Sequence, residues 1–91
     1  MDILDLNPEV LEATATIIEG YCGRQKMLME AYVKNTEGLS FEWTDDQTMG
    51  LLLDEIKHLR DNVEETMDEI LAFYPGYFRD KAEQIRRRPK F

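Results

Sequence analysis

The sequence lacks long apolar runs and a positively charged start, and each absence excludes a class of protein. No apolar stretch approaches the roughly 18 to 20 residues that are needed to cross a bilayer. The first residues, 1–5, carry acid where a secretory signal peptide needs a positive start and an apolar core. We therefore expect no membrane insertion, and a chain that is either cytoplasmic or secreted without a conventional signal peptide.

Cysteine and histidine are also scarce. Cys22 is the only cysteine, which excludes an intramolecular disulfide and a thiolate metal cluster. It lies within a helical pattern, where we expect a small, half-buried side chain. A catalytic thiol would need a nearby base, and the single histidine, His58, falls in the other expected helix.

The sequence is rich in apolar and acidic residues. The 91 residues are 43% hydrophobic, which is too rich for a disordered chain and enough for one small domain. Residues 1–78 hold 17 acidic and 5 basic side chains, a net charge of −12, whereas residues 79–91 hold 2 acidic and 6 basic ones, a net of +4. The main part of the chain should repel nucleic acid and anionic membranes, and only the basic tail can attract them.

The first helix is expected over about residues 8–35. Asn7 is a favoured N-cap, Pro8 suits the first helical position, and Glu9 adds acid to the first turn. Residues 35–38, Asn-Thr-Glu-Gly, are typical of a helix end. Between these limits one row of residues recurs at three- and four-residue steps, interrupted by Arg24 and flanked by Leu11, Ile18 and Tyr32: Val10, Thr14, Ile17, Tyr21, Leu28 and Ala31.

The second helix is expected over about residues 44–73, after a loop at 36–43. Thr44 and Gln47 form a capping box. Apolar residues then follow with an average spacing of about 3.5, the period of a left-handed coiled coil. The residues that we predict as the partner interface belong to this row: Met49, Leu52, Ile56, Leu59, Val63, Ile70 and Phe73.

Pro75 is expected to stop or kink this helix, because proline lacks a backbone donor. Residues 77–88 would then form a short basic helix that docks on a partner or on the chain's own assembly. Its predicted docking residues are Arg86, Arg87, Arg88 and Lys90. We place the hairpin at residues 1–78 and the tail at 79–91, and expect that deleting the tail leaves the hairpin folded.

The fold that these elements predict is an all-α, antiparallel two-helix hairpin with a short C-terminal basic helix. Near-equal helices joined by a short loop fold back on each other. One hairpin buries too little apolar surface for its size, so we expect it to assemble into a four-helix bundle. The partner is either a second copy or a related helical chain.

The loop contains Trp43 directly before the cap Thr44, followed by Asp45. Trp43 either plugs the end of the hairpin or contacts a partner. With its length, acidic character and missing signal peptide, the chain resembles the WXG superfamily of small helical hairpins exported by type VII secretion systems. The family motif is Trp-x-Gly, and here Asp45 replaces the glycine. The family's C-terminal Tyr-x-x-x-Asp/Glu signal is absent, since Lys81 follows Tyr77 by four positions.

This resemblance implies a partner, a chaperone or a substrate of a bacterial type VII secretion system, which docks a larger secreted effector. Two alternatives remain: a helical adaptor or regulatory protein unrelated to secretion, and a nucleic-acid-associated protein that uses the basic tail.

Enzymatic chemistry finds little support in the residues. Glu55 and His58 match the Glu-x-x-His ligand pair of di-metal helical bundles, but the apolar row places His58 on the outer flank. No phosphate-binding glycine loop or nucleophile motif is present in the sequence. We therefore expect no enzyme, no metal site and no cofactor.

Overall fold

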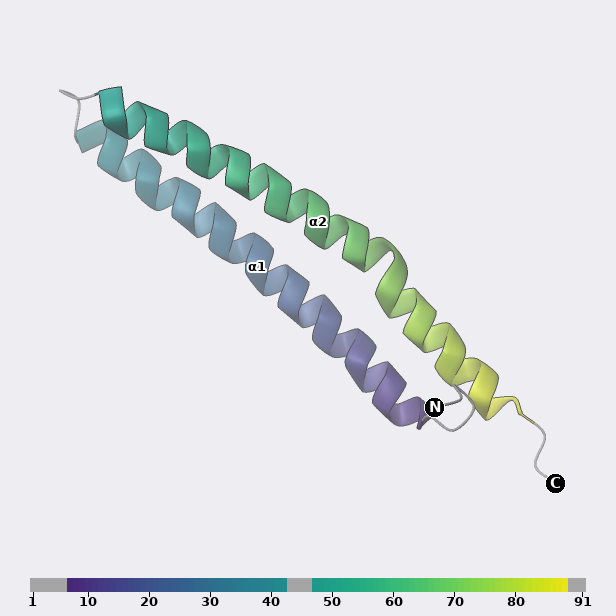
Figure 1. The fold of residues 1–91 in the computed structure, drawn as a ribbon. Helices are drawn as coiled ribbons and strands as arrows, with labels where there is room; N and C mark the ends of the chain where they lie inside the picture. The colour runs from purple at the N-terminus through teal and green to yellow at the C-terminus, as the bar shows by residue number, and fades with distance from the viewer. Residues whose placement is uncertain (1–6, 43–46, 89–91) are drawn as a thin grey trace. The chain divides into compact units, whose positions relative to one another are not determined.

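The computed structural model describes residues 7–42 and 47–88, and this part of the chain is helical without a strand. Helix α1 spans Pro8–Glu42 and helix α2 spans Gln47–Arg86 (Figure 1). Neither helix is long and apolar enough to cross a membrane. The predicted cap of the second helix, Thr44, lies outside the described residues.

Helix α1 begins as predicted and ends later than predicted. The N–H of Glu9 donates to Asn7 Oδ1 at 2.8 Å, which is the expected cap. The helix then continues past residue 35 to Glu42, so the loop predicted at 36–43 is wrong over residues 36–42. Thr36 is buried within this continuation, and its hydroxyl donates to the carbonyl of Tyr32 one turn earlier at 2.8 Å. Gly38 has no positive φ that would end it.

Helix α2 runs through Pro75 without a break. The separate basic helix predicted for 77–88 is therefore wrong, because residues 77–86 are the last part of α2. Pro75 and Ala82 are both buried. A proline inside a helix removes one backbone hydrogen bond, and burial of the Pro75 ring itself offsets part of that loss.

The chain divides into two compact units, each made from both helices. Of the described residues, unit 1 contains 7–22 and 68–88, and unit 2 contains 23–42 and 47–67. In unit 1, Glu12 pairs with Arg86 and Glu19 pairs with Arg79, so the start of α1 runs antiparallel to the end of α2.

In unit 2 the two helices also run antiparallel, because the later residue of α1 pairs with the earlier residue of α2. Glu30 lies 3.9 Å from Arg60, and Glu37 lies 4.0 Å from Lys57. Two helices that pack against each other confirm the predicted all-α hairpin. The four-helix assembly stays a prediction.

Candidate partner-binding surface

The side chains of α1 that pack inward include several small ones. In unit 1, Ala15 is 0% and Cys22 is 1% exposed, and Ala82 of α2 is also 0% exposed. Small residues at a helix contact let the two backbones approach closely. We call the buried side chains of α1 the inner row: Leu11, Ala15, Cys22, Met29, Val33 and Thr36. Cys22 is thus more deeply buried than the sequence predicted.

The bulky apolar side chains of α1 point elsewhere. Val10 is 59%, Ile17 is 66%, Tyr21 is 51% and Leu28 is 45% exposed. The row predicted as the packing face of the first helix therefore lies largely outside the contact with α2. Of its predicted flank, Leu11 is buried, Ile18 is half-buried and Tyr32 is exposed. We call this set, in which every residue except the half-buried Thr14 is exposed, the outer row of α1: Val10, Thr14, Ile17, Tyr21, Arg24, Leu28 and Ala31.

The predicted partner interface on α2 divides between two environments. Met49, Ile56, Val63 and Ile70 are half-buried, seven residues apart along the helix. Leu52, Leu59 and Phe73 are 41%, 49% and 57% exposed. These three belong to an exposed row, the outer row of α2: Leu52, Glu55, Leu59, Asn62, Thr66, Glu69 and Phe73.

Within unit 1 the exposed apolar residues lie away from the ion pairs. Val10 and Ile17 each precede an ion-paired glutamate by two residues, and Tyr77 precedes the ion-paired Arg79 by two. Two residues correspond to about 200° around a helix. Unit 1 therefore carries ion pairs along one edge and an apolar surface on the other side, made by both helices.

Unit 2 repeats this arrangement. Leu28 lies two residues before Glu30, and Leu59 lies two residues after Lys57, while Glu30 and Lys57 face the other helix in ion pairs. The same helical geometry turns Leu28 and Leu59 away from the ion-paired edge. Each unit thus offers another helix an apolar surface.

Aromatic rings extend the surface of unit 1 along α2. The rings of Phe73 and Tyr77 stack with centroids 5.5 Å apart, and Tyr74 meets Phe73 edge-on at 5.2 Å. Lys81 Nζ lies 5.4 Å from the centre of the Tyr77 ring. Exposed tyrosines with ordered rings are favoured in protein interfaces, because they bury a large area at a low entropic cost. The sequence prediction missed Tyr74, because it does not share the row of Phe73.

The ion pairs of unit 1 hold the end of α2 on the start of α1. Arg79 donates to both carboxylate oxygens of Glu19, at 2.5 and 2.9 Å, and Arg86 binds Glu12 in the same two-pronged way. These hydrogen bonds lower the pKa of Glu19 and of Glu12 below the usual value. Arg86, a predicted docking residue, is therefore engaged by its own chain.

We expect these two carboxyls to make unit 1 sensitive to acid. Because the fold lowers both pKa values, their contribution to stability is present above the usual glutamate pKa of about 4.3 and is lost as pH falls below it. Urea unfolding at pH 6 and at pH 3.5 measures the loss. The variant Arg79→Gln with Arg86→Gln should lose less stability between these pH values than the unchanged chain. An equal loss in both chains would contradict this prediction.

The other predicted tail residues differ in their surroundings. Arg87 binds Glu83 one turn earlier on α2, and Arg88 is exposed. Lys90 lies outside the described residues. Docking of these side chains on a partner stays a prediction.

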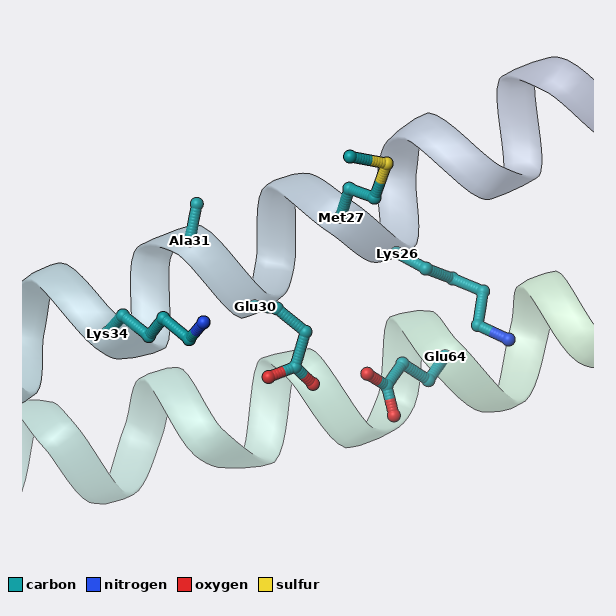
Figure 2. Close-up of a pocket in the computed structure, with 6 residues that line it drawn as sticks. All are labelled: Lys26, Met27, Glu30, Ala31, Lys34 and Glu64. Atoms are coloured by element: carbon teal, nitrogen blue, oxygen red, sulfur yellow. The ribbon is translucent and has the colours of Figure 1, made fainter.

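Unit 2 contains a hollow with charged residues in its lining, between α1 and α2. A hollow of about 440 Å³ is lined by Lys26, Met27, Glu30, Ala31 and Lys34 of α1 and by Glu64 of α2 (Figure 2). The carboxylates of Glu30 and Glu64 face each other there. A hydrogen bond with Glu30 is the main cause that raises the pKa of Glu64, and partial loss of solvent raises it further.

The Glu-x-x-His pair and the turn motif are the last features of the sequence to place. Glu55 and His58 are both exposed on α2. Among the described residues, no group of three or more His, Cys, Asp and Glu side chains is placed to hold a metal ion. The turn motif Trp43, Thr44 and Asp45 lies outside the described residues, so both predicted roles of Trp43 remain predictions.

Comparison of the chain with protein-family models, with curated proteins and with solved structures gives no match. The candidate site is therefore defined by the two outer rows and by the charges that border them.

Proposed function

We propose that this protein is a non-enzymatic helical binding module whose two outer rows pack against another helical chain. One observation carries the proposal: α1 buries small residues such as Ala15 and Cys22 against α2 and leaves Ile17 and Tyr21 exposed. A helix that served only its own hairpin would bury its largest apolar side chains, because burial of each is worth about 1.5–3 kcal/mol.

The placement of the exposed residues supports binding of a helix. They recur along both helices at three- and four-residue steps, the pattern by which one helix packs on another. In each unit they lie on the side away from the ion pairs. Large apolar surfaces with a polar border are typical of protein interaction sites.

The biological setting that we propose is a bacterial type VII secretion system, with this chain as a WXG-like partner, chaperone or substrate. The helical hairpin supports this proposal, together with the acidic sequence and Trp43. A helical adaptor unrelated to secretion would use the same surface. A nucleic-acid role is less favoured, because glutamates of its own chain engage Arg79 and Arg86.

Capture and export of the chain in the native cell test this proposal. We expect the tagged protein to co-purify with a helical partner and with components of the secretion machinery, and to appear in the medium only when the secretion ATPase is present. The variant Ile17→Asp should lose the partner by at least about tenfold while remaining helical, because a charge placed in the outer row meets an apolar partner surface.

The matched control is Thr16→Asp, which adds the same charge at the neighbouring exposed position outside the outer row. It should retain the partner. Capture of a partner without any dependence on the ATPase would favour the adaptor. Undiminished capture by Ile17→Asp would refute the proposed surface.

A further inference from the structure

The two outer rows carry charges of opposite sign. The outer row of α1 has one charged residue, Arg24, and the outer row of α2 has two, Glu55 and Glu69. All three are exposed, and none forms an ion pair with any residue in the part of the chain that the structure describes. By contrast, Glu12, Glu19 and Arg86, which lie on the edges between the helices, are paired.

A hollow beside Arg24 has the form of a coiled-coil packing site. It measures about 400 Å³ and is lined by Arg24, Met27, Leu28 and Ala31 on the outside of α1. These residues stand at positions i, i+3, i+4 and i+7, the four that surround the side chain of a facing helix in knobs-into-holes packing. The hollow therefore fits an apolar side chain from a second helix, such as those in the outer row of α2.

We propose that the occupant of this surface is a second copy of the same chain, with the outer row of α1 packed against the outer row of α2 of the other copy. This inference rests on the proposed function and specifies the partner and its arrangement. Each chain carries both halves of the contact, because its α1 supplies the cation and the hollow while its α2 supplies the anions and exposed leucines. A two-fold axis then forms the same contact twice.

The alternative, with each outer row packed on its own copy, is disfavoured by charge. An α1–α1 contact would contain only Arg24 from each chain and an α2–α2 contact only glutamates, so neither could form an ion pair. Like charges in a contact between helices are repulsive, and such charges select among possible pairings. The arrangement of unlike rows removes this repulsion and gives Arg24 an acidic surface.

Charge reversal on the full chain tests the arrangement. The unchanged protein should dimerise in analytical ultracentrifugation at micromolar concentration. The variant Arg24→Glu should weaken the dimer by at least about tenfold, and so should Glu55→Lys combined with Glu69→Lys, because each turns attraction into repulsion at both contacts. The triple variant, with all three charges reversed, should recover most of the lost affinity.

The matched control is Asp54→Lys combined with Glu65→Lys, which changes the net charge equally on exposed positions of α2 outside the outer row. It should leave the dimer within about threefold of the unchanged protein. Circular dichroism of each variant verifies that it stays helical.

Two results would overturn the inference, and they are distinguishable. A dimer that is unaffected by Arg24→Glu would refute the unlike-row arrangement and leave the binding surface standing. A chain that stays monomeric at all concentrations would refute the second copy, and capture of a different helical partner from the native cell would then preserve the proposed function.

Discussion

Replacing Val33 with aspartate is expected to unfold most of the protein, whereas replacing Val10 with aspartate is expected to leave it folded. The two residues are chemically identical and differ in position. Val33 is 3% exposed in the inner row, and Val10 is 59% exposed in the outer row. An unpaired charge in the inner row should cost about 3–5 kcal/mol, a large part of the roughly 5–15 kcal/mol that stabilises a folded domain. Urea unfolding followed by circular dichroism at low micromolar concentration measures the difference.

The Val10 variant also serves as the control for lost β-branching and added charge. Aspartate near the start of a helix interacts favourably with the helix dipole, so Val10→Asp should not weaken α1 by itself. The variant Val10→Asp should instead bind its partner chain more weakly. If both variants unfolded at the same urea concentration in the monomer, the assignment of inner and outer rows would be wrong.

The sequence predicts well those features that local chemistry determines. The start of α1 follows from Asn7 and Pro8, and the cap geometry is the predicted one. The amphipathic period of about 3.5 predicted two long helices that fold back on each other. Each of these inferences depends on neighbouring residues alone.

Helix ends were predicted poorly, because glycine and proline were interpreted as stops that both helices tolerate. Gly38 and Pro75 are both unfavourable within helices, yet α1 passes the first and α2 passes the second. A glycine costs only about 1 kcal/mol in a helix interior, and α1 continues past Gly38 although Leu39 and Phe41 are exposed.

The sequence also did not predict which side of α1 packs against α2. Two rows with the same period run side by side along this helix, one with Ala15 and Cys22, the other with Ile17 and Tyr21. Hydrophobicity favours the bulkier row as the core. The contact with α2 instead uses the row that contains Ala15 and Cys22, and only the packing of the two helices in the structure reveals that choice.

Removing residues 79–91 is expected to melt unit 1, contrary to the expectation from sequence that the hairpin survives without its tail. Ala82 is fully buried and Ile85 is half-buried, so the truncation exposes apolar surface on the first turns of α1. That loss should cost on the order of 2 kcal/mol, because burial of one large aliphatic side chain is worth about 1.5–3 kcal/mol. Truncation also leaves Glu12 and Glu19 without their arginines, which lowers stability further at neutral pH.

Hydrogen exchange at the backbone amides locates the effect. Protection should fall over residues 8–22, which pair with the lost segment, and should persist over residues 23–42 of unit 2. A shorter truncation that removes only residues 89–91 is the control, and it should leave exchange at residues 8–22 unchanged, because Ala82, Arg79 and Arg86 all remain. If the longer truncation also left these amides protected, α2 beyond Phe78 would be dispensable for the fold, and its basic residues would be available to a partner.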